Sequence, residues 1–233
     1  MTETNTEISI DITDIFGEKT DEVRVTVYFP SHSVGIIKNL TLDDNSTITP
    51  HIFNKKILFI GDSITQGYDS RYDSLSYAYR VSRFFDAESI IYGVGGGYYN
   101  KKIFDGINFA PDMVILAFGT NDFTHYHTVD EVNTNAEEFM NLVKEEYTEA
   151  RNVFVISPIW RLDNINGKGG IDSLASCRKV IAEQAKAHGF IHIDGATLVP
   201  PSCEFFADLS LHPNALGFGI YAENLIRQII AYM

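Results

Sequence analysis

The sequence lacks the features of several large protein classes. Its two cysteines, Cys177 and Cys203, stand in no CxxC or other spacing typical of metal sites, so we interpret both as reduced thiols. Basic residues are scarce: 18 Lys and Arg stand against 31 Asp and Glu, and the net charge is −13. Nucleic-acid-binding proteins concentrate cations to displace counterions, so no nucleic-acid partner is expected. The sequence also shows no membrane-spanning apolar run and no secretion signal, which predicts a cytoplasmic protein without a membrane partner.

What is present is enough apolar material for one substantial core: 45% of the 233 residues are hydrophobic. Residues 7–12 and 22–29 alternate apolar and polar side chains, the pattern of strands with one face in water. We therefore predict a small antiparallel β appendage over residues 1–54. It is too short to close a sandwich alone, so we expect it to pack on the main domain or on another copy in a homo-oligomer.

From residue 55 onward the pattern changes to strands alternating with helices, which is typical of a parallel sheet covered on both faces. The helix over 129–150 has the clearest start, because Thr128 and Glu131 form a capping box. The domain expected over 55–233 contains five strands, at 56–60, 89–92, 113–118, 153–157 and 190–193, and helices at 74–85, 129–150, 172–188 and 215–232.

Four polar motifs follow the predicted strands. Ser63 comes after the first strand, a glycine cluster at 93–97 after the second, Gly-Thr-Asn-Asp at 119–122 after the third, and His212 after the fifth by a longer loop. Functional groups of such sheets gather beyond the carboxyl ends of the strands. We therefore expect these four motifs on one rim.

Taken singly, each motif has a simpler structural explanation. A Gly-Asp-Ser turn is commonly a helix N-cap, and Thr65 stands where a GxSxG elbow needs its second glycine. The glycine cluster is not a dinucleotide fingerprint, because position 98 is Tyr98, and it can be a tight turn after a strand. Asn121 can be an ordinary turn residue.

As an ordered set, the motifs resemble the SGNH hydrolases, also called the GDSL esterase/lipase family. The resemblance covers residues 55–233. It implies that Ser63 is the nucleophile and His212 the general base. It also implies an oxyanion hole made by the backbone N–H groups of Ser63 and Gly96 and the side-chain amide of Asn121.

The chemistry of ester cleavage suits these residue types. The reaction passes through a tetrahedral oxyanion, and preorganised donors aimed at it are usually the largest catalytic contribution. Glycine lets the backbone approach the reacting carbon, and the amide of Asn121 stays neutral at any working pH. Gly95 is the alternative to Gly96, because the register is ambiguous in a run of three glycines.

One spacing departs from the family pattern. The family usually has its aspartate three residues before the histidine, whereas Asp208 stands four before His212. The extra residue can bulge out and leave Asp208 on the imidazole, or a backbone carbonyl can hold the histidine instead. In the first case Asp208 fixes the tautomer and stabilises the imidazolium without taking the proton.

Other side chains are expected on the same rim. Tyr98, Tyr126 and Trp160 are the predicted substrate contacts, although Trp160 can equally cap the core. Arg161 follows Trp160 after the fourth strand. The His-Tyr-His segment at 125–127 lacks a third ligand, so we interpret it as a polar loop and predict neither metal nor cofactor.

The pattern and the resemblance together predict an α/β fold: three layers, α/β/α, with a five-stranded parallel flavodoxin-like sheet and the small N-terminal antiparallel β appendage. The appendage before the hydrolase domain is similar to that of carbohydrate esterases with an N-terminal β domain. The expected function is a serine esterase that removes a short acyl group from a carbohydrate or small hydroxylated substrate, and acetyl is the leading candidate for that group. The alternatives are a lysophospholipase or thioesterase with the same machinery, and an inactive glycan-binding module.

Overall fold

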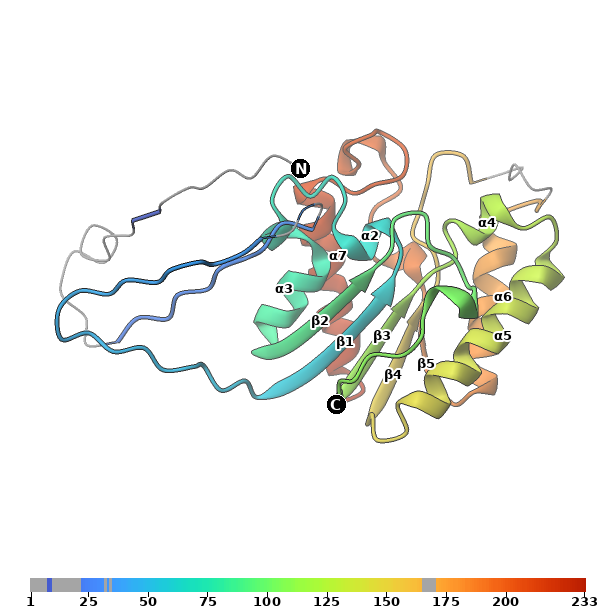
Figure 1. Cartoon of the computed structure of the whole chain (residues 1–233). Helices are drawn as coiled ribbons and strands as arrows, with labels where there is room; N and C mark the ends of the chain where they lie inside the picture. The colour runs from blue at the N-terminus through green and yellow to red at the C-terminus, as the bar shows by residue number, and fades with distance from the viewer. Residues whose placement is uncertain (1–7, 10–21, 32, 34, 165–170) are drawn as a thin grey trace.

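Five parallel strands form one sheet with helices on both faces (Figure 1). The computed structural model describes residues 8–9, 22–31, 33, 35–164 and 171–233. The strand order is β2-β1-β3-β4-β5, with every neighbouring pair parallel, which is the flavodoxin-like order of doubly wound sheets. The strands are β1 (Lys55–Gly61), β2 (Ala87–Gly93), β3 (Met113–Ala117), β4 (Asn152–Ile156) and β5 (Ile191–Ile193). The predicted parallel sheet is therefore confirmed.

Alternate residues of the strands feed two separate cores. In β1, Ile57 and Phe59 pack on one face, and Leu58 and Ile60 pack on the other. This follows from the strand period of two, which sends successive side chains to opposite faces. All four side chains are fully buried. Such near-continuous apolar runs belong to strands covered on both sides.

Helices cover both faces of the sheet (Figure 1). On one face lie α3 (Tyr77–Phe84) and α7 (Ala215–Ile230), and on the other lie α5 (Val129–Glu146) and α6 (Leu174–Ala187). The capping box predicted at the start of α5 is present: Thr128 Oγ1 accepts the N–H of Glu131, whose carboxylate accepts the N–H of Thr128. No helix in the described ranges is long and apolar enough to cross a membrane.

The expected N-terminal β appendage is not found in the part of residues 1–54 that the structure describes. Residues 22–29 form no strand, and the other predicted strand, at 7–12, falls largely outside the described residues. Val25 and Val27, on the apolar side of the alternation, are both exposed. Residues 22–29 contact the main domain instead through individual side chains. Arg24 donates to Asp86 at 2.8 Å, and this bond is the main cause that lowers the pKa of the Asp86 carboxyl.

Candidate active site

A sharp turn at the carboxyl end of β1 carries Ser63. A side chain at Gly61 would place its Cβ 2.1 Å from Thr65 Oγ1 and 2.6 Å from the carbonyl oxygen of Ala117. Only glycine fits there, so the chain can turn directly from the strand into the short helix α2 (Ser63–Gln66).

Asp62, and not Ser63, caps this helix. The Asp62 carboxylate accepts the Ile64 N–H at 2.8 Å. The simpler explanation of the Gly-Asp-Ser turn therefore applies to the aspartate, and the Ser63 hydroxyl points elsewhere. Its Oγ lies 3.0 Å from Nε2 of His212, which is 149 residues away in sequence. That distance is within the reach a base needs to take a hydroxyl proton.

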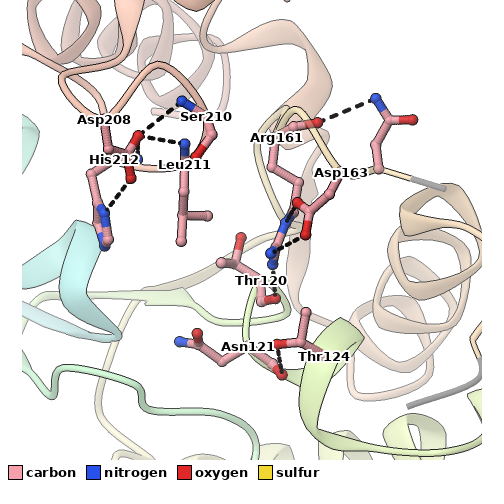
Figure 2. Close-up of polar contacts among 10 residues, drawn as sticks. Thr120, Asn121, Thr124, Arg161, Asp163, Asp208, Ser210, Leu211 and His212 are labelled. Carbon is pink, nitrogen blue, oxygen red and sulfur yellow. Dashed lines mark hydrogen bonds and ion pairs between the residues drawn. The ribbon is translucent and has the colours of Figure 1, made fainter. Parts of the chain in front are cut away.

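His212 is held from its other side by Asp208. Nδ1 of His212 lies 2.9 Å from Oδ2 of Asp208 (Figure 2). The ring of Tyr68 packs beside the imidazole, with the ring centroids 4.8 Å apart. The structure thus brings the three residues proposed from sequence into one hydrogen-bonded row, from Ser63 through His212 to Asp208.

The extra residue before His212 is accommodated by a bulge. Leu209 has φ of 62°, in the left-handed region, and its side chain is 61% exposed. The loop thereby wraps Asp208, whose Oδ1 accepts the N–H groups of Ser210, Leu211 and His212 at 2.9, 2.7 and 3.1 Å (Figure 2). Partial burial raises the pKa of the Asp208 carboxyl, but these N–H groups and His212 outweigh it and lower the pKa below its ordinary value.

A second carboxylate lies near the same imidazole. Oδ2 of Asp69 is 3.9 Å from Nδ1 of His212, beyond hydrogen-bond distance, and Asp69 also has a left-handed φ of 65°. Within the described ranges, Asp69, Asp208 and His212 are the group whose geometry could hold a metal ion. Two of its members already belong to the row that ends at Ser63. In the His-Tyr-His segment, the ring of His125 stacks on Tyr98.

Asn121 lies in the turn after β3, at the start of the short helix α4 (Asp122–His125). Its side chain makes no capping bond, and Nδ2 instead donates to the Gly97 carbonyl at 2.8 Å. A primary amide has two N–H donors, so the second can serve a ligand. The adjoining Asp122 accepts the N–H of Tyr99 at 2.9 Å. These two bonds tie the turn after β3 to the loop after β2.

The glycine cluster offers fewer candidate donors than its sequence suggests. The N–H of Gly97 donates to the Val94 carbonyl at 2.8 Å within the turn. This leaves Gly95 and Gly96, the two candidates from sequence. Gly96 has φ of 74°, which explains why this position is glycine although a Cβ there would meet nothing within 4 Å.

Two buried carboxylates flank these motifs, Asp62 beside Ser63 and Asp122 beside Asn121. Burial raises the pKa of each to about 7, although N–H groups that donate to them act in the opposite direction. The charge of Arg161 also lowers the pKa of Asp62, whereas the charge of Asp62 raises the pKa of Asp122. Desolvation is the main cause in both cases, since neither side chain has appreciable contact with water.

The predicted substrate contacts differ in how available they are. Tyr98 stacks on His125 with ring centroids 3.9 Å apart. Tyr126 uses its hydroxyl to donate to the Tyr99 carbonyl at 2.7 Å, and Trp160 packs on Phe206 at the edge of the core. All three side chains thus make contacts within the protein, and their role in binding substrate stays a prediction.

Comparison with known proteins gives a consistent picture. The model of the GDSL-like Lipase/Acylhydrolase family matches residues 59–220. A carbohydrate acetylesterase family member from Sinorhizobium meliloti is 18% identical, with a TM-score of 0.60 over 76% of this chain and 98% of that one. A salicylyl-acyltransferase from a tetracycline biosynthetic pathway is 19% identical, with a TM-score of 0.65 over 81% of this chain and 56% of that one.

A family two carbohydrate esterase from Clostridium thermocellum, in complex with cellohexaose, is 20% identical, with a TM-score of 0.58 over 80% of this chain and 66% of that one. At such identities the likeness establishes the fold alone. No curated protein matches the chain by sequence.

Proposed function

This chain belongs to the GDSL-like lipase/acylhydrolase family, a family of ester hydrolases, and we propose that it is a serine esterase that removes an acetyl group from a carbohydrate or another small hydroxylated molecule. The observation that carries the proposal is the row of contacts from Ser63 Oγ to His212 Nε2 at 3.0 Å and from His212 Nδ1 to Asp208 Oδ2 at 2.9 Å. This is the arrangement of nucleophile, base and orienting carboxylate.

In the first half of the reaction, Ser63 Oγ attacks the ester carbonyl carbon while Nε2 of His212 takes the hydroxyl proton. The carbonyl electron pair moves to the oxygen, which becomes the oxyanion. When the tetrahedral intermediate collapses, the bond to the alcohol breaks, and the alcohol leaves with the proton from His212. An acyl group then remains on Ser63.

In the second half, water attacks the acyl carbon and gives a proton to His212. Collapse releases the carboxylic acid, and the proton returns to Ser63. Asp208 keeps the N–H at Nδ1, which fixes the tautomer of the neutral imidazole and stabilises the imidazolium that forms in each half. The oxyanion is held by the N–H of Ser63, the N–H of Gly96 or Gly95, and the second N–H of the Asn121 amide. The chain's own groups supply each step, so the proposal includes no cofactor.

A sugar-like alcohol is supported by the aromatic rings beside the row. Tyr68 packs against His212, and Tyr98 lies across the rim on His125. Ring faces pack against the apolar faces of sugars, while tyrosine hydroxyls bond to polar groups. The similar carbohydrate acetylesterase and cellohexaose-bound esterase point the same way.

A second candidate, a hydrolase of longer acyl chains, is favoured by two exposed leucines. Leu162 and Leu209 lie on neighbouring loops, which are joined by the bond from the Leu162 N–H to the Ser210 carbonyl at 2.9 Å. Apolar side chains in that position could line a path for an acyl tail.

Chromogenic acetyl and octanoyl esters separate the two candidates. We expect the wild type to prefer the acetyl ester, to release acetate from acetylated oligosaccharides and to carry one acetyl group on Ser63 during turnover, detected by mass spectrometry. Ser63→Ala should abolish these signals, whereas Ser202→Ala should retain them, because the Ser202 hydroxyl bonds only to Glu204 among the contacts the structure gives it. A strong octanoyl preference would favour the second candidate, and absence of any hydrolysis would overturn both.

A further inference from the structure

Arg161 is a buried cation behind the turn that carries Asn121. It follows β4 on the loop that passes the end of β3, and it is only 6% exposed. Arginine is rarely buried unless its charge and N–H donors are satisfied. The proposed reaction does not use it directly, so its burial requires a separate explanation.

The guanidinium makes three well-directed hydrogen bonds (Figure 2). Nη1 donates to the Thr120 carbonyl at 2.7 Å. Nε and Nη2 donate to the two carboxylate oxygens of Asp163 at 2.6 and 3.0 Å. The guanidinium also lies over the ring of Phe123, 5.4 Å from its centroid. A planar fork held on two sides in this way has one orientation, which a lysine ammonium would not reproduce.

The Thr120 carbonyl is the significant acceptor, because it belongs to the peptide unit that enters Asn121. Fixing that carbonyl fixes the plane of the peptide and hence the position of the Asn121 Cα, from which the side chain leaves the backbone. The side chain is then fixed at its other end by the bond from Nδ2 to the Gly97 carbonyl at 2.8 Å. Backbone and amide of the proposed oxyanion donor are thus held separately.

We propose that Arg161 is a positioning residue for the oxyanion hole: its guanidinium, oriented by Asp163, holds the Thr120 carbonyl so that the free N–H of the Asn121 amide faces the reacting oxygen. The inference rests on the proposed function. It assigns to Arg161 no contact with substrate. An error of about 1 Å in a catalytic group can reduce the rate about 100-fold, so a brace of this kind has a measurable effect.

The first experiment compares Arg161→Lys with Arg178→Lys. Arg178 is a matched control, because its Nε also donates to a backbone carbonyl, that of Pro158, at 2.7 Å, but outside the Asn121 turn. We expect Arg161→Lys to lower kcat for the acetyl ester about 10- to 100-fold with little change in KM. Arg178→Lys should leave kcat within about twofold of the wild type.

A double-mutant cycle with Asn121→Ala tests whether Arg161 acts through the amide. Asn121→Ala alone should lower kcat about 100- to 1,000-fold, as loss of one oxyanion donor does. In that background Arg161→Lys should change kcat by less than about twofold, because residues that act together are not additive. A full additional loss in the Asn121→Ala background would overturn the inference and leave a general structural role.

Asp163→Asn provides a second route if Arg161→Lys fails to fold. Asp163 is 55% exposed, so its substitution should leave the fold intact, which circular dichroism and thermal unfolding can verify. Asp163→Asn loosens the Arg161 guanidinium without removing it, so kcat should fall by less than in Arg161→Lys. In the Asn121→Ala background, Asp163→Asn should leave kcat nearly unchanged. An unchanged kcat in Asp163→Asn would contradict the assigned role of Asp163.

Side-chain amide NMR makes the test independent of ester hydrolysis. The Asn121 amide signals are assigned by their loss in Asn121→Ala. In Arg161→Lys these signals should shift or broaden, whereas in Arg178→Lys they should stay in place. Unchanged signals in Arg161→Lys would overturn the inference even if the esterase proposal holds. A wild type without esterase activity, but with the expected shifts, would instead overturn the proposed function while the positioning of Asn121 stands.

Discussion

The two sides of the proposed active site are built in different ways. On the acid–base side, Asp208 and His212 lie on one loop, and their side chains are 33% and 17% exposed. The carboxylate is held by the N–H groups of Ser210, Leu211 and His212. On the oxyanion side, Asn121 depends on groups distant in sequence, among them Arg161 from the loop after β4 and the carbonyl of Gly97 from the loop after β2.

This difference separates activity from stability. The acid–base side is local and partly in water, so a change there should reduce catalysis with little effect on folding. The oxyanion side is interior and includes buried ionisable groups, so a change there should also alter stability and its dependence on pH. Three substitutions test this contrast.

The largest effect is expected on the acid–base side. In Asp208→Asn, the amide oxygen can still accept the loop N–H groups, but an amide N–H facing Nδ1 disfavours the tautomer that His212 needs. We expect kcat for the acetyl ester to fall about 10,000-fold, the size found when the corresponding carboxylate of a serine protease is replaced. The melting temperature should change little, because the carboxylate is partly exposed.

Asp69→Asn is the matched comparison, since that carboxylate lies 3.9 Å from the same nitrogen without a hydrogen bond. Its effect on kcat should be far smaller. Equal losses in the two variants would mean that the two carboxylates share the orienting role.

An intermediate effect, on stability, is expected on the oxyanion side. The folded-state pKa of Asp122 is raised to about 7 by burial, against about 3.9 in an unfolded chain. The native state therefore binds this proton more tightly. The stability that it contributes is fully present below pH of about 4 and is lost as pH rises through about 7.

Asp122→Asn cannot lose that proton. The free energy of unfolding of the variant should therefore rise relative to the wild type by about 1.4 kcal/mol per pH unit between these limits, reaching a few kcal/mol at pH of about 8. Urea unfolding at several pH values measures this difference. A difference that does not vary with pH would show that folding does not raise the pKa of Asp122.

Much of the main domain could be predicted from sequence because its pattern is local. Strand β1 is predicted at 56–60 and is Lys55–Gly61. Its signal is local, because the apolar run and the glycine turn that ends it both lie within the segment. Helix α3 was predicted from residue 74 but begins at Tyr77, because Asp73–Leu75 forms a separate 3₁₀ turn and Ser76 provides the N-cap. Such boundaries depend on capping geometry, which composition does not reveal.

The N-terminal prediction is wrong for residues 22–29, which form no strand, whereas the predicted sheet of the main domain is confirmed. Alternation in residues 22–29 indicates a face able to pack, but it does not provide the partner that a strand needs. Here the described contacts are separate: Tyr28 meets Tyr79 edge to face, and Arg24 pairs with Asp86. The domain boundary at residue 54 and the cytoplasmic location stay predictions.

Within the site, the order of the motifs along the rim was enough to predict that Ser63 and His212 meet. The bulge that leaves Asp208 on the imidazole was one of two alternatives, and only the structure distinguishes them. The brace at Arg161 could not be predicted, because it depends on how the loop after β4 passes the turn after β3. The catalytic roles of Ser63, His212 and Asp208 stay predictions until the variants are measured.

The smallest expected effect concerns the bulge on the acid–base side. Leu209 has φ of 62°, which is unfavourable for a side chain with a Cβ, so Leu209→Gly should relieve strain. Leu216 is a matched control because it is also 61% exposed but lies in the first turn of α7. Leu209→Gly should lower the free energy of unfolding by less than about 0.5 kcal/mol, or else raise it. Leu216→Gly should lower the free energy of unfolding by about 1 kcal/mol. Equal losses in urea unfolding would mean that the Leu209 side chain supports the loop, and that the acid–base side depends on more than the hydrogen bonds around Asp208.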